Sequence, residues 1–444
     1  MSVATLPALP AATPAAAVPA APRTVDPARL ATRPMRWWLL SVLAANLVVA
    51  VVLLLTTRSF AAAATAAGTM ASVDVGLAAL IRQQDVVNGL FALATRTPKG
   101  WPIRVRAAIA QVHQVGAGVH VGAAISAVGW FLAFTALTAL APATPLRPAV
   151  LGIAGGILAV LVTMAVLARP SARESRHDRF EHSHRWGGWA ALGLFTALTI
   201  VLAADAPTSF PVALATSPGA WILLAVAVAA LIPWLQLRRL PVTIECPSDH
   251  VALVTADRGR PVRIGSATRI ARHPLGQWHA FATVARPDRT DFRLAVSRAG
   301  NWTGDFIDDR PEAVWVRGVP TTGVGSVSRL FHGVVWIATG SGIAPVLPHL
   351  LGEDTPAHLL WVTRNPERTY GADLVADIRT ADPSALFWDT DANGKPDLVA
   401  LAREAVARTG AEAVVCISNR RTTLRVVGEL RRQGVPAYGP IWDS

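Results

Sequence analysis

Long apolar runs are the feature that most constrains how this chain can fold. Nearly all runs of about 18 or more mostly apolar residues lie before Arg238, while charged residues concentrate after it. Runs of this length can cross a bilayer as helices. Since 52% of the residues are hydrophobic and only 16% are charged, the chain is also more apolar than an ordinary globular protein. We therefore expect a bundle of membrane helices followed by a soluble part.

The apolar part predicts about six membrane-spanning helices. The second is the weakest of them, because it is rich in alanine and contains Asp74, and an acidic residue is costly inside a bilayer. Residues 1–35 are rich in alanine and proline and cannot bury a core, so we expect a disordered cytoplasmic tail there. The spans are predicted at Trp37–Thr57, Ala61–Ile81, Ala107–Leu140, Pro148–Leu167, Trp186–Ala204 and Ala220–Leu237.

Arginine and lysine residues predict the orientation of these spans. Short cytoplasmic loops carry an excess of basic residues. With the N-terminus in the cytoplasm, the loops on the outer side contain only Arg58 and Arg147, and the other basic loop residues lie inside. We therefore expect a multi-pass integral protein of the plasma (inner) membrane with both termini in the cytoplasm and the lipid bilayer as its partner.

The net charge and the cysteines exclude several other classes of protein. The formal net charge is +12, but no dense basic cluster alternates with aromatic residues, so we expect no nucleic-acid partner. Cys246 and Cys416 are the only cysteines and lie far apart. This argues against a disulfide framework and against a thiolate metal site, and favours a reducing compartment for the soluble part.

The soluble part divides into two predicted domains. Residues 241–330 contain short strand-like runs separated by Gly, Pro and Asp, which predict a small antiparallel barrel. In residues 331–444 strand-like and helical runs alternate, which predicts a parallel nucleotide-binding sheet. The expected domains are therefore the tail 1–35, a helical membrane domain 36–240, the barrel and the α/β domain.

A glycine-rich turn is the most specific local motif. The hydrophobic run that ends at Thr339 is followed by Gly340-Ser-Gly342-Ile-Ala-Pro345, which opens a predicted helix. Glycines at such a turn let backbone amides approach a phosphate, and the helix N-terminus adds partial positive charge. A tight strand-to-helix turn without a ligand is the alternative interpretation, but the position of the motif after a barrel-like domain favours nucleotide binding.

These motifs, in this order, resemble the ferredoxin–NADP reductase superfamily, specifically integral membrane flavoproteins of the ferric-reductase and NADPH-oxidase type. Three further segments, Ile81–Asn88, His177–Glu181 and His184–Trp189, resemble its divergent TmpA-like branch. The resemblance implies that the barrel binds FAD and that the α/β domain binds NADPH or NADH.

The resemblance also implies a flavin site. The segment from Arg272 to Phe281 resembles the family's flavin-binding strand and would place His279 near the isoalloxazine; an ordinary strand with surface histidines is the alternative. Gly300-Asn-Trp-Thr303 resembles the family's pyrophosphate element, although the family's Gly-Pro-Tyr-Gly turn lacks its tyrosine here. The implied flavin-binding residues are Arg272, His273, Pro274, Trp278, Arg298, Gly300 and Thr303.

The implied nicotinamide site lies in the α/β domain. Arg364 follows a predicted strand where such folds meet the ribose, which favours NADPH over NADH; a solvated surface charge is the alternative. Trp442, near the C-terminus, resembles the aromatic ring that stacks over the flavin until nicotinamide displaces it; an interface tryptophan is the alternative. The implied nucleotide-binding residues are Thr339, Gly340, Gly342, Pro345, Arg364, Ser418 and Asn419.

Histidines gather near the cytoplasmic ends of the predicted spans. His113 and His120 are seven residues apart and share one helix face, and His182 and His184 begin the fifth span. Paired imidazoles suit one haem b; a proton-delivering or metal-binding pocket and plain helix packing are the alternatives. No histidine occurs in the outer halves of the spans, so the two-haem relay of the resembled type is not expected.

The sequence thus predicts an enzyme, an NAD(P)H-dependent oxidoreductase containing FAD. Reducing equivalents would pass through FAD, with Trp442 and His279 as catalytic residues, to a small-molecule or membrane-soluble acceptor at the cytoplasmic face of the membrane. A non-catalytic membrane sensor or regulatory protein that retains the flavin-reductase-like fold is the alternative.

Overall fold

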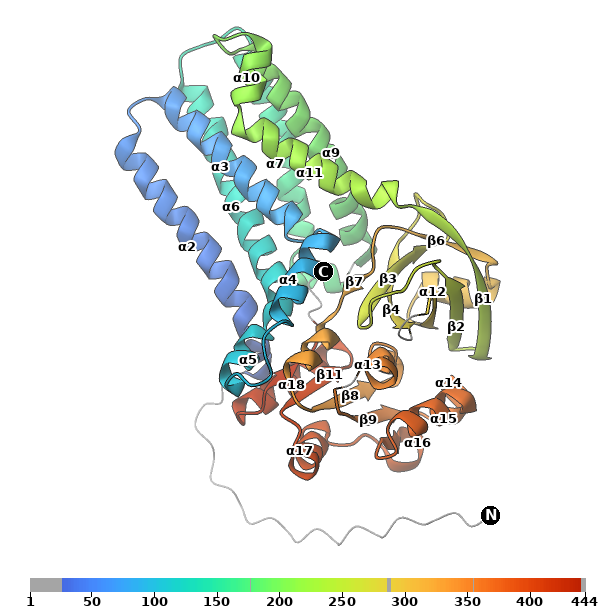
Figure 1. Cartoon of the computed structure of the whole chain (residues 1–444). Helices are drawn as coiled ribbons and strands as arrows, with labels where there is room; N and C mark the ends of the chain where they lie inside the picture. Colours follow the sequence, from blue (N-terminus) through green and yellow to red (C-terminus); the bar gives the residue numbers. More distant parts are fainter. Residues whose placement is uncertain (1–25, 176, 286–288, 354, 441–444) are drawn as a thin grey trace, which may run out of the picture.

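The computed structural model describes residues 26–175, 177–285, 289–353 and 355–440. A bundle of long helices stands on two smaller domains, the barrel and the α/β domain (Figure 1). Most of the predicted tail, residues 1–25, lies outside the described residues, as does Trp442.

Six helices of the bundle are long and apolar enough to cross a membrane, which confirms the predicted number of apolar helices, including the alanine-rich second one. They run roughly along one direction in Figure 1. Their bounds are α2 (Arg33–Thr56), α3 (Phe60–Leu80), α6 (Val112–Leu140), α7 (Arg147–Leu167), α9 (His177–Ala204) and α11 (Pro218–Leu235). Shorter helices are α4 (Gln84–Ala94), α5 (Ile103–Ile109), α8 (Pro170–Ser175) and α10 (Phe210–Thr216).

Small residues allow α2 to pack closely on α6. A Cβ atom on Gly118 would lie 2.3 Å from the carbonyl oxygen of Met35, and one on Gly122 would lie 2.9 Å from Cβ of Val42. Such close approach is the usual way in which helices associate in an apolar solvent.

A polar network explains how the bundle accommodates the acidic residue of α3. Asn46 on α2 donates a hydrogen bond to Oδ1 of Asp74 (3.2 Å) and accepts one from the indole of Trp130 on α6 (2.6 Å). The Asp74 side chain is buried. The network therefore ties α2, α3 and α6 together through side chains that would be costly to expose to lipid.

One segment differs from the expected disordered tail. Residues Pro27–Ala31 form the short helix α1, whose N-cap Asp26 accepts a hydrogen bond from the amide of Ala28. Ala31 is buried, and a Cβ on Gly428 would lie 2.0 Å from the carbonyl oxygen of Pro27. The structure of residues 27–35 thus depends on tertiary packing against the α/β domain, which local composition does not report.

The barrel consists of six antiparallel strands in the closed order β3-β4-β5-β2-β1-β6, with β6 pairing back to β3. The short strand β7 adds to β3, and α12 (Asn301–Asp309) follows β5 and buries Phe306 and Ile307. The strands are β1 (Arg238–Ser248), β2 (Val251–Asp257), β3 (Ser266–Ala271), β4 (His279–Ala285), β5 (Asp291–Ser297), β6 (Ala313–Val316) and β7 (Thr321–Thr322).

The α/β domain contains a five-stranded parallel sheet in the order β10-β9-β8-β11-β12. Alternate residues of the central strand β8 enter two hydrophobic clusters, one on each face of the sheet, as expected for a sheet covered by helices on both sides. The strands are β8 (Val334–Thr339), β9 (Ala357–Thr363), β10 (Leu386–Asp389), β11 (Ala413–Ile417) and β12 (Ala437–Tyr438). The helices are α13 (Leu347–Gly352), α14 (Pro366–Tyr370), α15 (Ala372–Ala381), α16 (Thr390–Asn393), α17 (Leu398–Thr409) and α18 (Arg420–Arg432), with short 3-10 turns at Val324–Leu330 and Gly340–Ile343. This confirms the predicted fold class.

A buried ion pair joins the helical bundle to the α/β domain. Both terminal nitrogens of Arg106 on α5 donate to Glu412, at 2.7 and 3.0 Å, and the same side chain donates to the carbonyl oxygens of Trp101 and Leu330. The Arg106 side chain is only 5% exposed. Glu412 also accepts hydrogen bonds from the backbone and ring of His332. The hydrogen bond from Arg106 is the largest cause that lowers the pKa of Glu412 to about 2.

We expect Glu412→Gln to lower the thermal unfolding temperature of the detergent-solubilised protein. Breaking a buried pair from one side costs about 3 kcal/mol. Because the folded pKa of Glu412 is below its ordinary value of 4.5, its contribution is present above about pH 5 and is lost as the pH falls towards 2. The variant should therefore also show a weaker pH dependence over that window.

The matched control is Glu429→Gln, which breaks an ion pair whose arginine, Arg432 on α18, is 44% exposed, and it should change the unfolding temperature little. Equal unfolding temperatures and equal pH slopes for Glu412→Gln and wild type would refute the importance of this pair.

Candidate active site

The glycine-rich turn lies where the α/β sheet reverses its strand order. The neighbours of β8 are β9 and β11, so the chain runs outwards in both directions from this point, which is where open parallel sheets bind ligands. Gly340 has φ +51°, and a Cβ on Gly342 would lie 2.2 Å from the carbonyl oxygen of Ile417. Both glycines are thus required by the backbone, and Pro345 lies in the turn between them and α13.

Two hydroxyl groups connect the ends of the neighbouring strands β8 and β11. Oγ1 of Thr339 lies 2.6 Å from Oγ of Ser418, which brings together two residues that the sequence analysis proposed separately. Asn419 caps α18 by accepting a hydrogen bond from the amide of Thr422. The adjacent Cys416 is fully buried, and burial raises the pKa of its thiol to about 12, which fits a strand-core role.

Arg364 lies just beyond the end of β9, with its side chain 81% exposed and 3.8 Å from Asp391. The next residue, Asn365, has φ +25° and caps α14 by accepting a hydrogen bond from the amide of Arg368. The turn fixes the backbone of Arg364 at the sheet edge, and the exposed guanidinium is accessible to a phosphate.

On the barrel side, rings from β4 and α12 pack together. The His279 ring lies 4.2 Å from the Trp302 ring, centroid to centroid, and Trp302 also stacks on Phe306 at 5.2 Å. The Thr303 hydroxyl accepts hydrogen bonds from the amides of Ala299 and Gly300. The turn before α12 is thereby fixed, and the first helical amides, which lack intrahelical partners, point out of the helix N-terminus.

Arg298 and Arg272, which the sequence analysis expects at a flavin site, contact acidic residues of α12. Arg298 binds Asp308 through two nitrogens, one of them at 3.0 Å, and Arg272 pairs with Asp309. The hydrogen bond with Arg298 is the main cause that lowers the pKa of Asp308. Exposed pairs of this kind are weak, so either arginine can exchange its carboxylate for a phosphate at small cost.

The loop between β3 and β4 is attached to the helical bundle. Nδ1 of His273 accepts a hydrogen bond from the amide of Leu275, and the indole of Trp278 donates to the carbonyl oxygen of Pro274. Arg185 on α9 donates to the carbonyl oxygens of Leu275 and Gly276, at 2.8 and 2.6 Å. The proposed flavin loop is therefore held directly by a helix of the bundle.

The structure separates the proposed haem ligands. The rings of His120 on α6 and His184 on α9 lie 6.0 Å apart, whereas the ring of His113 packs edge-on against Tyr438 at 5.9 Å. His120 bonds to the carbonyl oxygen of Ala78 through Nδ1, and Nδ1 of His184 is buried without a hydrogen-bond partner among the described residues. His182 has an exposed side chain. His120 and His184 are thus the pair brought together.

Sequence reasoning missed the contributions of Trp302, Arg185 and Arg317. Trp302 was noticed only as part of a glycine motif, although an aromatic residue in the first turn of α12 was the available signal. Arg185 contacts Leu275, about 90 positions away in the chain, and Arg317 contacts Trp278, about 40 positions away. No local sequence pattern predicts such contacts.

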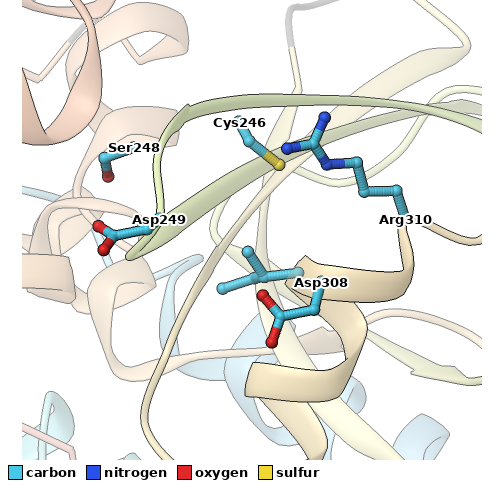
Figure 2. A pocket seen from close by; sticks show the side chains of 6 residues that line it. Cys246, Ser248, Asp249, Asp308 and Arg310 are labelled. Atoms are coloured by element: carbon cyan, nitrogen blue, oxygen red, sulfur yellow. The ribbon is translucent and has the colours of Figure 1, made fainter.

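A shallow cavity of about 640 Å³ opens on the barrel near the other end of α12. Figure 2 shows the guanidinium of Arg310 and the thiol of Cys246 pointing towards one another, with Asp249 and Asp308 below them. None of the site residues proposed from the sequence lines this cavity.

Comparison with known proteins gives the following relatives. Residues 324–444 match the family model described as "Adenylate-forming reductase 03009, C-terminal domain". The chain is 36% identical over 383 residues to adenylate-forming reductase 06235 of Coprinopsis cinerea and 35% identical over 382 residues to adenylate-forming reductase 03009 of the same fungus. Each alignment covers 85% of this chain but only 37% of the relative.

Among solved structures, the chain is similar to a ferredoxin NADP+ reductase from Neisseria gonorrhoeae with bound FAD and NADP, with 16% identity over 46% of this chain and 99% of that chain and a TM-score of 0.36. It is also similar to the Amycolatopsis cytochrome P450 reductase GcoB, with 15% identity over 47% of this chain and 71% of that chain and a TM-score of 0.36.

We expect Gly342→Ala to weaken dinucleotide binding about tenfold or more. The added methyl group would meet the carbonyl oxygen of Ile417 at 2.2 Å, so the turn must move away from β11, and such overpacking costs about 1–3 kcal/mol. Titration of the purified protein with NADP+ in a calorimeter measures this change. Gly333→Ala, whose Cβ would meet only ordinary contacts of 3.7 Å or more, is the control and should bind normally. Equal affinities for both variants would contradict the proposed role of the turn.

Proposed function

We propose that this chain is a membrane-bound oxidoreductase that binds FAD and a nicotinamide dinucleotide and delivers reducing equivalents to an acceptor at the cytoplasmic membrane face. The observation that carries the proposal is the Gly340–Gly342 turn at the reversal point of the parallel sheet, next to the paired hydroxyls of Thr339 and Ser418. Such a turn is built to receive a pyrophosphate. The closed barrel that precedes the sheet supplies the second cofactor site.

The residues on the nucleotide side fit a dinucleotide. The backbone amides of the turn would bind the pyrophosphate, and the hydroxyls of Thr339 and Ser418 would orient the nicotinamide end. Arg364 would bind a 2′-phosphate through its planar fork, which is the basis for preferring NADPH to NADH. Pro345 and Asn419 would hold the helical segments that border the site.

The residues on the barrel side fit a flavin. The first turn of α12, from Gly300 to Thr303, would bind the pyrophosphate of FAD together with Arg298 or Arg272. The ring face of His279, which Trp302 covers in this structure, would contact the isoalloxazine. When bound, FAD converts a two-electron donor into one- or two-electron steps. Trp442, outside the described residues, is proposed to cover the flavin.

The membrane location and the acceptor are parts of this proposal. Six apolar helices of sufficient length and the predicted cytoplasmic excess of basic residues support an integral membrane protein of the TmpA-like type. The two relatives are named adenylate-forming reductases, and their names support a reductase. The acceptor that we propose is a small-molecule or membrane-soluble compound. The matched region is 37% of each relative.

One haem b between α6 and α9 is the remaining part of the proposal. The rings of His120 and His184 lie 6.0 Å apart, edge to face, and these two imidazoles would hold the haem iron. The hydrogen bond from His120 Nδ1 to Ala78 would orient the ring and leave Nε2 as the ligand atom. A proton-delivering pocket formed by the same two histidines is the alternative.

An anaerobic absorption spectrum of the purified, detergent-solubilised protein tests the function. We expect a flavin spectrum that bleaches on addition of NADPH, more slowly with NADH, and an Arg364→Gln variant in which the ratio of the two rates falls about tenfold. Arg368→Gln, an exposed neighbour on α14, is the control. A protein without flavin would favour the non-catalytic sensor instead.

The haem makes a separate prediction. The same preparation should show a Soret band that shifts on reduction, and both His120→Ala and His184→Ala should abolish it, because each removes one of the two imidazoles that would hold the haem. His113→Ala should retain the band, since His113 packs against Tyr438 instead. A band that survives both substitutions would reject these ligands, and a wild-type protein without a band would leave the pocket as a proton-delivering site.

A further inference from the structure

Two arginines face each other across neighbouring barrel strands. Ile270 pairs with Val316, and Ala271 with Trp315, in the antiparallel contact of β3 with β6. The same register, extended by one residue, places Arg269 opposite Arg317. Like charges in directly opposite positions repel and destabilise a sheet, so this arrangement needs a compensating negative charge.

The described part of the chain provides no such compensation. Neither Arg269 nor Arg317 has a carboxylate within 4 Å or a hydrogen bond to a protein acceptor among the described residues. Both side chains are half-buried. Burial, followed by repulsion from Arg269 and Arg185, lowers the pKa of Arg317 to about 10. Each guanidinium carries five N–H donors in a planar fork, so the pair presents unused donors to whatever lies between the barrel and the bundle.

Aromatic rings and a third arginine shape the site. The guanidinium of Arg317 lies 4.5 and 4.6 Å from the ring centres of Trp234 on α11 and Trp278 of the flavin loop. The two ring planes are almost perpendicular, at 81°, so the rings border the guanidinium on two adjacent sides and add cation–π attraction. Arg185 arrives from α9 and holds the same loop. The loop that carries Trp278 is therefore attached to α9.

The position of the site suggests which anion it receives. Arg269 pairs with Ala280, and Ile270 with His279; because side chains alternate along a strand, Arg269 and His279 lie on opposite faces. The arginine site is thus separate from the flavin contacts of His279. It lies where α9 and α11 meet the barrel (Figure 1), which is the headgroup level if the helices cross a membrane.

We propose that Arg185, Arg269 and Arg317 form a binding site for a phosphate group at the junction of the helical bundle and the barrel. Planar guanidinium forks match the oxygen spacing of phosphate and bind it bidentately. The phosphate belongs either to an anionic lipid of the cytoplasmic leaflet or to a small phosphorylated ligand. This inference does not depend on the proposed oxidoreductase activity, since it concerns binding alone.

The test measures binding to the full-length protein in detergent, without NADPH. Inorganic phosphate is titrated in a calorimeter, and retained lipid is identified by native mass spectrometry after incorporation into phosphatidylcholine bilayers with or without phosphatidylglycerol. We expect Arg317→Gln and Arg269→Gln each to weaken the binding about tenfold or more. Arg263→Gln, an exposed arginine of the same barrel, is the matched control and should bind as wild type does.

The two arms distinguish the sources of the phosphate. Binding of inorganic phosphate indicates a small phosphorylated ligand, and selective retention of phosphatidylglycerol indicates a lipid; either result, lost in the two variants, supports the site. Absence of both, or an equal loss in Arg263→Gln, would overturn it. A parallel loss of bound flavin in Arg269→Gln and Arg317→Gln would also overturn it, because the phosphate would then be that of FAD.

Discussion

Arg106 and Glu412 form the contact on which the placement of the α/β domain depends. The helical bundle has an apolar surface, so it can hold a soluble domain only through the few polar groups at its end. Arg106 binds Glu412 at the start of β11 and the carbonyl oxygen of Leu330 just before β8. These two segments lead into the neighbouring strands that carry the glycine turn and Ser418. The buried guanidinium of Arg106 therefore contacts both segments that lead into the proposed dinucleotide site.

The barrel is attached to the helices through hydrogen bonds to the backbone of one barrel loop. Gln84 and Asn88 on α4 donate to the carbonyl oxygens of Val319 and Pro320, and the amide of Gly318 donates to the carbonyl oxygen of Pro233 on α11. The position of a backbone N–H or C=O group is set by the path of the chain, so such a hydrogen bond does not depend on which side chain the barrel residue carries. The orientation of the barrel is thus tied to the helices at several points. This fits a protein in which a cofactor must face the end of the bundle.

The sequence predicted well those features that local patterns determine. The six apolar helices, the barrel and the parallel sheet follow from run length and periodicity, and the Gly340–Gly342 turn is a local motif. A pair formed by His113 or His120 with His182 or His184 was predicted, but the choice of His120 and His184 was not, because it depends on how α6 meets α9 and β12. Likewise the opposition of Arg269 and Arg317 depends on the closure of the barrel, which sets a register between strands 46 residues apart. Composition alone also missed α1, whose order comes from its contact with α18.

The Asn46–Asp74–Trp130 network has a consequence for how the bundle is assembled. The mean hydropathy of α3 is 1.3, against 2.7 for α2, and an aspartate near the centre of a span costs about 2.5–3.5 kcal/mol during insertion. If the bundle crosses a membrane, α3 is therefore a poor candidate to enter the bilayer alone. The amide of Asn46 on α2 and the indole of Trp130 on α6 belong to the same hydrogen-bond network as Asp74. Because α2 and α3 both pack mainly on α6, this network is complete only when all three helices are together.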